Sequence, residues 1–417
     1  MYMVNPYTGK TIFVQIAAYR DPELEPTLDD MFDKATEPDN IHVCICWQHT
    51  EEDEWDTLAK YQDDVRVTII DIAANDSKGV CWARNLIQQE YKGEDFTLQL
   101  DSHHRFIDGW DTELKNEIMT LQIQGYEKPL LTGYISAYHP SWDEKDWVKE
   151  PWGMVFDRFT PDGVVFFAPQ PIPNWQELTA PIPARFYSAH FCFTLGSFCT
   201  EVQHDPEYYF HGEEIAIAVR AYTHGYDLFH PHKIVAYHEF SRDYRPDKHW
   251  DSYDKWTEHN LQTFSLMRQL LGIDGEASKE IREGQYGLGT ERTISDWESY
   301  AGVQFANRLV KQDTLDNKIP SNSDGEWLKH FKHFVDLPSI NAPEDDYDFF
   351  ALALHDKDGS SIYRRDVDTN EINDLKSNAM MNIKFECLLE GDVIPYEWIV
   401  WPHSISKGWC DRQTGLL

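Results

Sequence analysis

The sequence lacks the features that would place the protein in a membrane. No apolar run reaches the roughly 18–20 residues that a membrane-spanning helix needs. Residues Met1 to Lys10 also lack the basic and then apolar layout of a secretory signal peptide. We therefore expect no membrane partner and a cytoplasmic location.

Basic residues are scarce as well. The 417 residues contain 37 Lys and Arg against 72 Asp and Glu, which gives a formal charge of −35 and a pI near 4.7. The field of such a protein repels nucleic acid and anionic membrane surfaces. Because a local basic patch could override the net charge, nucleic acid is disfavoured as a partner but not excluded.

Cysteine is too rare to predict a disulfide framework. The seven cysteines are odd in number and lie mostly within apolar runs, where free cysteine is commonly buried. They are Cys44, Cys46, Cys81, Cys192, Cys199, Cys387 and Cys410. The spacing of Cys44 and Cys46 does not match a zinc motif. We expect all seven to be reduced residues of the core, as in a cytosolic protein.

Aromatic residues, in contrast, are abundant. They make up 14% of the chain, with 15 Trp, 21 Tyr and 22 Phe, which excludes a disordered protein. At this length a single core is no longer the best solution, so we expect one large domain and one small one. The expected division is a large domain over residues 1–310, a linker with a helical patch over 311–345, and a β-rich accessory domain over 346–417.

The N-terminal part alternates between strand and helix patterns. The expected strands are Thr11 to Ala17, Ile41 to Trp47, Val65 to Ile72 and Phe96 to Leu100. The expected helices between them are Pro22 to Ala35, Glu52 to Tyr61 and Gly79 to Tyr91. The strands are nearly continuous apolar runs, as buried parallel strands are. The alternation predicts right-handed βαβ units and an α/β fold with a mostly parallel sheet.

The middle of the chain is less regular. Trp142 to Pro183 is rich in Pro, Trp and Asp and predicts long loops with short strands. The elements expected after it are strands at Arg185 to Leu195 and Lys233 to His238, and helices at Gly212 to Tyr222, Trp250 to Leu271 and Ile294 to Phe305.

The C-terminal part predicts a small antiparallel β unit. A helical patch is expected at Trp327 to Phe334, and strands at Phe349 to Leu354, Ser361 to Arg365, Asn382 to Leu389 and Trp398 to Trp401. Aromatic residues gather near the end of the chain, at Tyr396, Trp398, Trp401 and Trp409. Such rings either bind sugars or partner proteins, or pack the unit against the large domain. We expect this unit to carry no catalytic group.

The strongest candidate for chemistry follows the strand at Phe96 to Leu100. Asp101 and His103 come directly after it, and residues two apart in an extended backbone point the same way. Ligands of open α/β sheets bind just outside the carboxyl ends of the strands. The two side chains could therefore share one metal ion, whereas the alternative is that Asp101 caps the loop and His103 packs on it.

A third metal ligand is available at the end of another expected strand. His238 closes Lys233 to His238, while His211, His230 and His232 compete for the same role. One carboxylate and two imidazoles suit Mn²⁺ or a similar divalent ion. Spacing along the sequence does not choose among the four histidines.

Two further segments could contact a ligand. Glu213 and Glu214 open an expected helix, where the helix dipole alone would favour negative charge. Ser77 lies in a polar turn that leads through Gly79 into a helix carrying Arg84. An arginine there can donate two parallel hydrogen bonds to a phosphate. The alternative for this second segment is an ordinary turn with an exposed arginine.

Taken together, these segments resemble a known family. The resemblance rests on Ile16 to Asp21, Lys78 to Asn85, Gln99 to His103, Gly212 to Glu214, and Gly287 to Thr293. In this order and spacing they are similar to the retaining glycosyltransferases that move N-acetylglucosamine (GlcNAc) onto hydroxyl groups. These are relatives of the cytoplasmic Skp1 hydroxyproline GlcNAc-transferase and, more distantly, of the mucin-type polypeptide GalNAc-transferases. The resemblance covers roughly residues 10 to 305.

The resemblance implies a GT-A fold, a UDP-sugar donor and a divalent metal, Mn²⁺ first and Mg²⁺ as the alternative. It implies that the metal ligands are Asp101, His103 and His238, and that the donor-binding residues are Ala17, Tyr19, Arg20, Ser77, Arg84 and Asp101. Glu213 and Glu214 would face the sugar or the acceptor and, with Asp101, form the catalytic set. Gly79 is followed by Val80 where the family has proline, which is a departure at the turn.

The expected function is metal-dependent, retaining transfer of a sugar from a UDP-sugar to a hydroxyl group. GlcNAc is the favoured sugar, and a protein is the favoured acceptor. A hydroxylated DNA base, a glycan or a small molecule are alternative acceptors. Two other functions stay open: a non-catalytic carbohydrate- or protein-binding module on the same fold, and a metal-dependent hydrolase that uses the same Asp and His residues.

Overall fold

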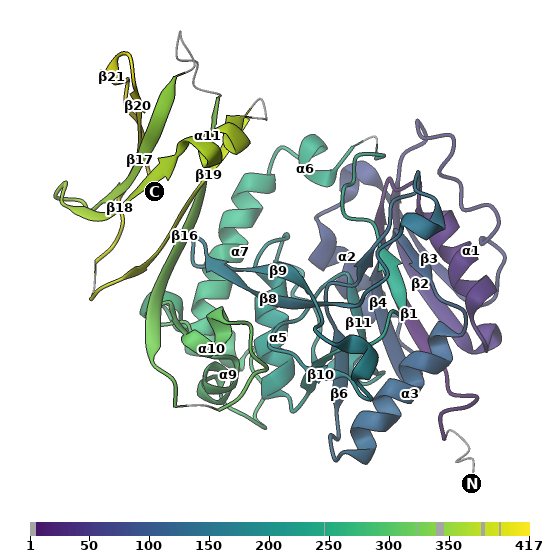
Figure 1. The fold of residues 1–417 in the computed structure, drawn as a ribbon. Coiled ribbons are helices and arrows are strands. Elements are labelled where there is room, and N and C mark those ends of the chain that lie inside the picture. Colours follow the sequence, from purple (N-terminus) through teal and green to yellow (C-terminus); the bar gives the residue numbers. More distant parts are fainter. Residues whose placement is uncertain (1–5, 246, 323, 339–345, 377–379, 392) are drawn as a thin grey trace.

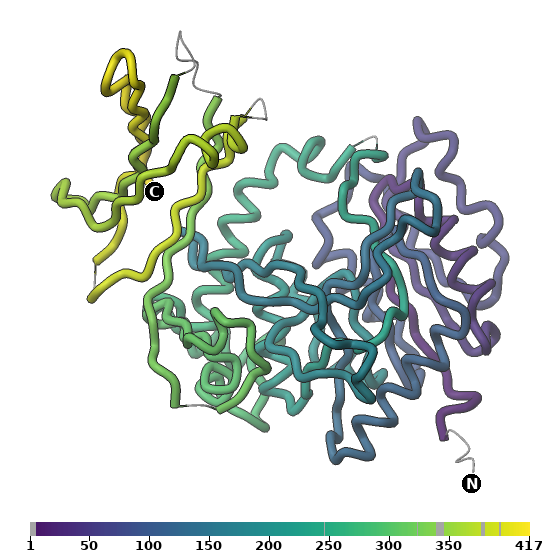
Figure 2. The backbone as a smooth tube through the Cα atoms, in the orientation of Figure 1, coloured from purple at the N-terminus to yellow at the C-terminus, as the bar shows by residue number. Residues whose placement is uncertain are grey.

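The fold comes from a computed structural model that describes residues 6–245, 247–322, 324–338, 346–376, 380–391 and 393–417. Figures 1 and 2 show a large α/β region and a smaller β-rich region beside it. One long strand, β16, runs from the first region into the second (Figure 1).

The large region is built on an eight-stranded mixed sheet in the order β10–β12–β6–β11–β4–β1–β2–β3. Its strands are β1 (Ile12–Tyr19), β2 (Ile41–His49), β3 (Val67–Ala73), β4 (Phe96–Asp101), β6 (Pro129–Thr132), β10 (Ile182–Pro183), β11 (Phe191–Leu195) and β12 (Asp227–His230). β1 lies parallel to β2 and β4, whereas β11 runs antiparallel between β4 and β6. The expected α/β fold and its four N-terminal strands are confirmed.

Helices cover both faces of this sheet because its central strands are apolar on both sides. They are α1 (Leu24–Lys34), α2 (Val80–Gln88), α3 (Trp110–Ile123), α4 (Phe198–Glu201) and α5 (Glu213–Thr223). Ile12, Val14 and Ile16 of β1 pack in one core with α1 and α3. Phe13, which points to the opposite face, packs with α2 and Cys199 of α4.

The helix expected at Glu52 to Tyr61 is wrong, because this segment is a series of turns. Its backbone hydrogen bonds join residues three apart, as from the amide of Asp56 to the carbonyl of Asp53. Leu58 has a φ of 47°, which a right-handed helix does not allow. The side chain of Asp56 accepts a hydrogen bond from the Trp47 indole at 2.7 Å, so contacts with the rest of the fold replace local helix formation.

A second group of elements completes the α/β region. It comprises the hairpin β8 (Trp152–Phe159) and β9 (Val165–Pro171), the small sheet β5 (His104–Phe106), β13 (Ala236–His238) and β7 (Ser136–Ala137), and the helices α6 (His249–Ser252), α7 (Trp256–Leu271), α8 (Lys279–Glu283) and α9 (Ile294–Ala301). Short 3₁₀ turns lie at Pro38–Asn40, Ala74–Asp76, Glu144–Asp146, Trp175–Glu177 and Ile273–Gly275. The hairpin, α5, α7 and α9 share one hydrophobic core.

Several expected boundaries shift in this part. The strand expected from Arg185 begins only at Phe191, the long helix begins at Trp256 after the short α6, and the helix from Ile294 ends at Ala301. The helix at Gly212 to Tyr222 and the strand ending at His238 are confirmed as α5 and β13.

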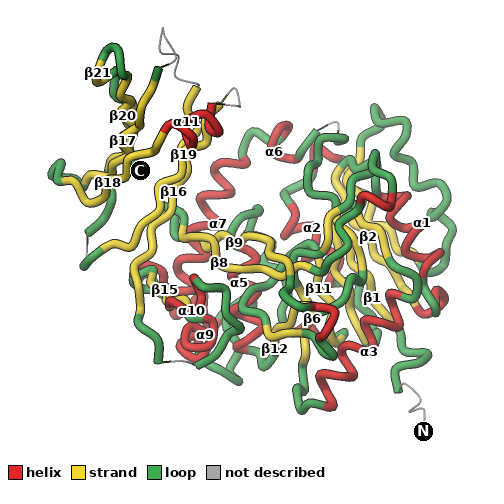
Figure 3. Tube along the Cα trace, viewed as in Figure 1, coloured by secondary structure: helices red, strands yellow, loops and turns green. Residues whose placement is uncertain are grey.

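The C-terminal region consists of strands with one helix of its own, α11 (Thr369–Lys376) (Figure 3). Before it come β14 (Val303–Gln304), β15 (Leu309–Lys311) and α10 (Gln312–Leu315). Its strands are β16 (Trp327–Pro338), β17 (Tyr347–His355), β18 (Ser361–Asp368), β19 (Met380–Leu389), β20 (Glu397–Ser404), β21 (Gly408–Trp409) and β22 (Gln413–Leu416). The four strands expected here are confirmed.

The helical patch expected at Trp327 to Phe334 is wrong, because these residues form the first part of β16. β16 pairs antiparallel with β19 from Lys329 to Pro338. On β19, Met381, Ile383 and Phe385 are buried in alternation, and this apolar face packs with β17, β20 and α11. A distant strand with period-two burial therefore decides the conformation of the segment.

Three other expectations have different outcomes. All seven cysteines are free, and five are buried, whereas Cys387 and Cys410 are half-buried. Within the described ranges, no helix has the length and apolar character needed to cross a membrane. The division at 310 and 345 stays a prediction, and residues 339–345 of its linker and 1–5 of the N-terminus lie outside the described residues.

Candidate active site

A cavity of about 620 Å³ opens at the carboxyl ends of β1 and β4. All residues that line it come from the stretch between Ala17 and Trp250. One part of its wall carries polar and charged side chains, and the other part is aromatic. The predicted position at the strand ends is the position that the fold provides for a ligand.

Three of the predicted residues meet in this cavity. Asp101 ends β4, His103 follows in the next turn, and His238 ends β13. Oδ2 of Asp101 lies 3.5 Å from Nε2 of His238 and 3.7 Å from Nε2 of His103. The ligand atoms of the three side chains lie within 4.8 Å of one another. The arrangement is that of a carboxylate and two imidazoles around one point.

His103 is oriented by a residue that sequence reasoning missed. Its Nδ1 lies 2.9 Å from Oδ2 of the fully buried Asp21. Burial opposes the charge of Asp21, but Arg245 and His103 outweigh it and lower the pKa of this carboxyl to about 2. In the tautomer that carries its proton on Nδ1, His103 donates a hydrogen bond to this carboxylate and its Nε2 lone pair faces Asp101, while Nη2 of Arg245 lies 2.5 Å from the same Nδ1.

His238 has the environment of a ligand rather than of a packed core histidine. Both of its ring nitrogens are buried and lack a hydrogen-bond partner among the described residues. Burial and the neighbouring His190 hold its pKa well below the usual range, so the ring is neutral. The rings of His190 and His238 stack with centroids 4.1 Å apart, which fixes the plane of His238.

The three competing histidines have other partners. His230 lies with Nδ1 2.7 Å from the Thr132 carbonyl, and its Nε2 accepts from the Met154 amide at 3.1 Å. His232 lies 3.1 Å from Glu117 on α3. His211 is exposed at the edge of the cavity, against Phe166. The structure thus brings His238, and not these three, to Asp101.

Arg84 connects the metal-site carboxylate with the two predicted glutamates. Its Nη2 lies 2.9 Å from Asp101 Oδ1, and its Nη1 lies 2.7 Å from Glu213 Oε1. Burial opposes its charge, but Glu213 and Asp101 outweigh this and hold the pKa of Arg84 above its usual value. Arg84 is therefore a buried cation between two carboxylates and not the exposed arginine of an ordinary turn.

Glu214 lies beside Glu213 at the start of α5. Its Oε1 accepts a hydrogen bond from the Ala189 amide at 2.9 Å. Burial raises the pKa of Glu214 to about 8, and the nearby charge of Glu213 adds to this effect. Near neutral pH the cavity wall thus presents one carboxylic acid, Glu214, which can donate a proton or a hydrogen bond.

Most of the expected donor-binding residues line the cavity, but Arg20 does not. Ala17, Tyr19 and Ser77 are on its wall. Arg20 instead forms ion pairs with Asp53 at 2.6 Å and with Asp247 at 2.5 Å.

The turn that precedes α2 depends on Gly79. Gly79 has a φ of 110°, and a Cβ atom there would lie 2.8 Å from the ring of Tyr209. Glycine is therefore required before α2 whatever residue follows it.

A basic segment at the rim was also missed from the sequence. Arg242, Arg245 and Lys248 follow His238 and line the cavity. In a chain with a formal charge of −35, three cations within seven residues are an unusual concentration and could have drawn attention to this segment. Arg245 pairs with the buried Asp21 at 2.6 Å, whereas Arg242 and Lys248 add positive charge to the cavity wall.

The remaining wall is aromatic. It is formed by Tyr134, Trp152, Phe166, Phe167, Phe240 and Trp250, of which Trp152, Phe166 and Phe167 come from the hairpin β8–β9. Phe240 is 39% exposed and lies near both Trp152 and Tyr134. The wall can accommodate a ring or another apolar surface beside the polar part of the cavity.

Solved structures with similarity to this chain are glycosyltransferases. GalNAc-T7 with UDP, GalNAc and Mn²⁺ is 14% identical with a TM-score of 0.43, and the match covers 69% of this chain and 54% of that one. *S. aureus* TarS 1–349 in complex with UDP-GlcNAc is 10% identical with a TM-score of 0.41, and the match covers 72% of each chain. The present chain thus spans about half the length of GalNAc-T7.

No curated protein matches the chain. A profile of the family described as Glycosyltransferase (GlcNAc), however, matches residues 11–63 and 56–307, which together are more than half of the chain. The matched range contains every residue that lines the cavity. The family match and the mixed sheet agree with the expected GT-A type of α/β fold. The chain therefore belongs to the GlcNAc glycosyltransferase family.

Proposed function

We propose that the protein transfers GlcNAc from UDP-GlcNAc to a hydroxyl group, with retention of configuration and with a divalent metal. The observation that carries this proposal is the set of Asp101, His103 and His238 at the end of β4, joined through Arg84 to Glu213. Membership of the GlcNAc glycosyltransferase family supports sugar transfer and the choice of GlcNAc. The choice of a protein acceptor rests on the sequence resemblance to hydroxyproline GlcNAc-transferases, which the comparisons do not show.

The residues present fit a divalent metal. Neither buried ring nitrogen of His238 makes a hydrogen bond to a described residue, and Nε2 of His238 and Nε2 of His103 both face Oδ2 of Asp101, at 3.5 Å and 3.7 Å. Oxygen and imidazole donors suit Mn²⁺, with Mg²⁺ as the alternative. When bound, such a cation would offset the negative charge that develops on the departing diphosphate. Asp101, His103 and His238 would hold it.

The chain itself supplies the remaining functions of the site. Ala17, Tyr19 and Ser77 border the space for the nucleoside. Arg242 and Lys248 line the cavity and would favour entry of an anionic donor into an otherwise acidic protein. Electrostatic groups fixed before the reaction stabilise developing charge without having to reorganise.

The acceptor would lie along the aromatic wall. Phe240, Trp152 and Phe166 offer apolar surface beside the metal set, where a hydroxyl-bearing ring such as hydroxyproline could pack. Glu214, protonated near neutral pH, is the carboxyl group on this wall able to exchange a proton there.

A donor screen tests the proposal. The protein is incubated with UDP-GlcNAc, UDP-GalNAc, UDP-Glc or UDP-Gal, with and without Mn²⁺, and the release of UDP is measured. We expect the fastest release with UDP-GlcNAc and a loss of release after chelation of the metal. The anomeric coupling in the NMR spectrum of the product reports whether configuration is retained.

The alternatives give different results in the same screen. UDP release that no hydroxylated peptide, glycan or small-molecule acceptor accelerates would favour a hydrolase. Donor binding without any UDP release would favour a non-catalytic binding module. Metal-independent release at the wild-type rate would contradict the role assigned to Asp101, His103 and His238.

A further inference from the structure

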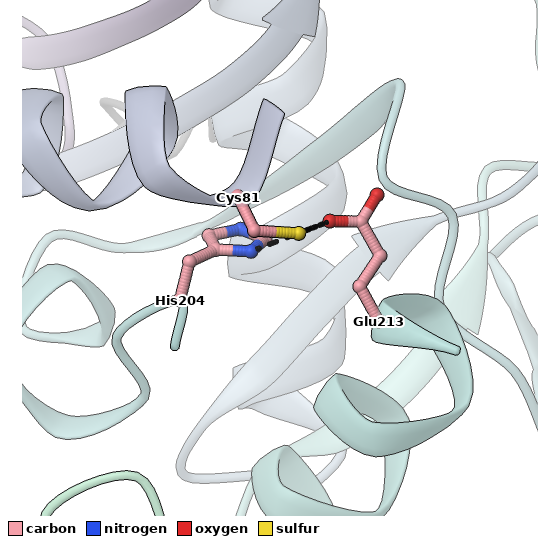
Figure 4. A group of neighbouring side chains, drawn as sticks. All are labelled: Cys81, His204 and Glu213. Carbon is pink, nitrogen blue, oxygen red and sulfur yellow. Dashed lines mark hydrogen bonds and ion pairs between the residues drawn. The ribbon is translucent and has the colours of Figure 1, made fainter. Parts of the chain in front are cut away.

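A second cluster lies directly behind the cavity. Cys81 of α2, His204 of the loop before α5, and Glu213 at the start of α5 meet with their side chains pointing toward one another (Figure 4). Sγ of Cys81 lies 2.5 Å from Oε2 of Glu213, and Nδ1 of His204 lies 3.7 Å from the same oxygen. All three side chains are buried.

The residue types could suggest a thiolate metal site, but the surrounding charges oppose one. Arg84 already pairs with Oε1 of Glu213, and Arg220 lines the same small space of about 10 Å³ behind the cavity with its Nη2 unpartnered among the described residues. Burial and the charge of Glu213 raise the pKa of the Cys81 thiol well above its usual value. The cysteine is therefore a protonated donor to Glu213.

The carboxylate of Glu213 is thus held from two positions on one helix. Cys81 donates to Oε2 and Arg84 to Oε1, and these residues are three apart on α2 and lie on the same face. Nη2 of the same Arg84 donates to Asp101 at 2.9 Å. A continuous series of hydrogen bonds therefore runs from the metal-site carboxylate through Arg84 and Glu213 to the thiol.

His204 closes the remaining side of the cluster. Its Nε2 lies 2.7 Å from Oε1 of Gln99, its amide donates to Gln88, and its carbonyl accepts from Asn85. The contact with Gln99 orients the ring and the other two hold the backbone of His204, so the space beside Oε2 of Glu213 is occupied by a well-held group. Glu213 lines both this small space and the donor cavity, so contacts behind the cavity set the orientation that it presents inside.

We propose that Cys81 is a positioning residue, whose thiol fixes the orientation of Glu213 toward the donor sugar. The inference rests on the proposed function, because it assumes that Glu213 faces the sugar. Cys81 itself lines the small space behind the cavity and is not among the residues that line the cavity. Its removal should then affect the part of donor recognition that depends on the sugar, and leave the part that depends on UDP and metal.

The test compares three variants of the full chain. Cys81→Ala removes the donor, Cys81→Ser retains one, and Cys199→Ala is the matched control. Cys199 is equally buried and lies 3.4 Å from Thr97 Oγ1, but it does not contact Glu213. Calorimetry measures the affinity for UDP and for UDP-GlcNAc, each with Mn²⁺, and steady-state kinetics separate kcat from KM.

We expect Cys81→Ala to bind UDP within about twofold of wild type. Its kcat, and the ratio of its UDP-GlcNAc affinity to its UDP affinity, should each fall by about tenfold or more, as expected for loss of a hydrogen bond to a charged group. Cys81→Ser should recover most of both quantities, and Cys199→Ala should change neither.

Three results would overturn the positioning role. The first is a Cys81→Ala variant with the kcat and affinity ratio of Cys199→Ala. The second is an equal loss of UDP and UDP-GlcNAc affinity, which would indicate general damage to the fold. The third is a Co²⁺–thiolate absorption band in wild type that Cys81→Ala removes, which would make Cys81 a metal ligand. A wild-type protein that turns over no UDP-sugar would overturn the proposed function and, with it, this role.

Discussion

The two regions of the molecule bury different kinds of side chain. In the α/β region, charged and polar groups such as Asp21, Arg84, His103, His238 and Glu213 are almost fully buried. In the C-terminal region, counting the described residues from 327 onward, Ser404 is the single buried polar side chain. The C-terminal core is otherwise formed by residues such as Phe350, Leu352 and Ile383.

The buried polar groups of the α/β region have an energetic cost that the apolar C-terminal core avoids. A buried polar group costs free energy unless it is hydrogen-bonded, and a buried charge costs more unless it is paired. The α/β region carries this cost around one cavity, where Arg84 pairs with two carboxylates and Asp21 holds His103. The described residues of the C-terminal region carry almost none of this cost, and none of them lines the cavity.

The largest expected effect comes from Asp101. Asp101→Ala should leave the fold intact and lower the rate of sugar transfer by about two to three orders of magnitude, because it removes a metal ligand and one partner of Arg84. Circular dichroism and UDP release measure the two quantities.

A matched aspartate in the other region sharpens this comparison. Asp336 lies on β16 and accepts a hydrogen bond from Asn382 at 2.8 Å. Asp336→Ala should change transfer by less than about twofold, as surface substitutions commonly do. Activity of Asp101→Ala within tenfold of wild type, with the metal still required, would refute the role given to Asp101.

The next effect separates two buried histidines of the α/β region. His238→Ala should weaken the binding of Mn²⁺ with UDP by about a hundredfold, whereas His230→Ala, whose ring nitrogens contact Thr132 and Met154, should not. His232→Ala should resemble His230→Ala, since His232 pairs with Glu117. Calorimetric titration of all three variants decides, and loss of metal by His230→Ala would mean that the ligand was misassigned.

Much of this site could be predicted from the sequence because it follows the strand pattern. β1, β2 and β4 are apolar runs, and Asp101 and His103 come at the end of one of them. The choice of His238 among four histidines needed the structure, because spacing along the chain does not show which strand ends meet.

Contacts between distant residues could not be predicted in this way. Cys81 and Glu213 are 132 residues apart, and Asp21 and His103 are 82 apart. The sequence at 327–334 predicts a helix, because the spacing of apolar residues is ambiguous between helix and strand over so few residues. Its strand partner β19 begins only at Met380. Short amphipathic segments take the conformation that their tertiary partner imposes.

A smaller effect concerns the pH dependence of stability. Glu214 keeps its proton in the folded protein up to about pH 8, while in the unfolded chain it ionises near the usual glutamate pKa of 4.5. Between these values the folded state binds more protons, so the free energy of unfolding falls as the pH rises from about 4.5 to 8. Glu214→Gln removes this contribution, and the variant should lose less stability between pH 5.5 and 8.5, by about a few degrees in Tm.

Thermal unfolding at several pH values measures this effect. Glu207→Gln is a suitable control, because Glu207 is an exposed glutamate of the same region. The control should keep the wild-type slope of Tm against pH. An unchanged slope in Glu214→Gln as well would show that Glu214 is already ionised in the folded protein at neutral pH.

The smallest expected effect on the donor comes from removing the C-terminal region. A chain that ends at Lys318 keeps every residue that lines the cavity, so its affinity for UDP with Mn²⁺ should stay within about threefold of wild type. It loses Lys332, whose Nζ lies 2.5 Å from Asp157 on β8, and Phe334, over which Arg158 lies. Because β8 and β9 carry much of the aromatic wall, transfer to a protein acceptor should fall more than donor binding does.

A point variant distinguishes two roles of the C-terminal region: support of β8, and direct contact with an acceptor. The rings of Trp401 and Trp409 lie with their centroids 4.4 Å apart and their planes tilted by 36°. They are 36% and 44% exposed, so they do not pack the unit against the α/β region through buried contact. If these rings bind the acceptor or its glycan, Trp409→Ala alone should reproduce the loss of transfer while leaving UDP release with small acceptors unchanged. If the region acts only through β8, Trp409→Ala should behave as wild type. A truncated protein that is folded by circular dichroism yet binds no UDP with Mn²⁺ would show that the donor site needs the C-terminal region, and the contrast between the two regions would fail.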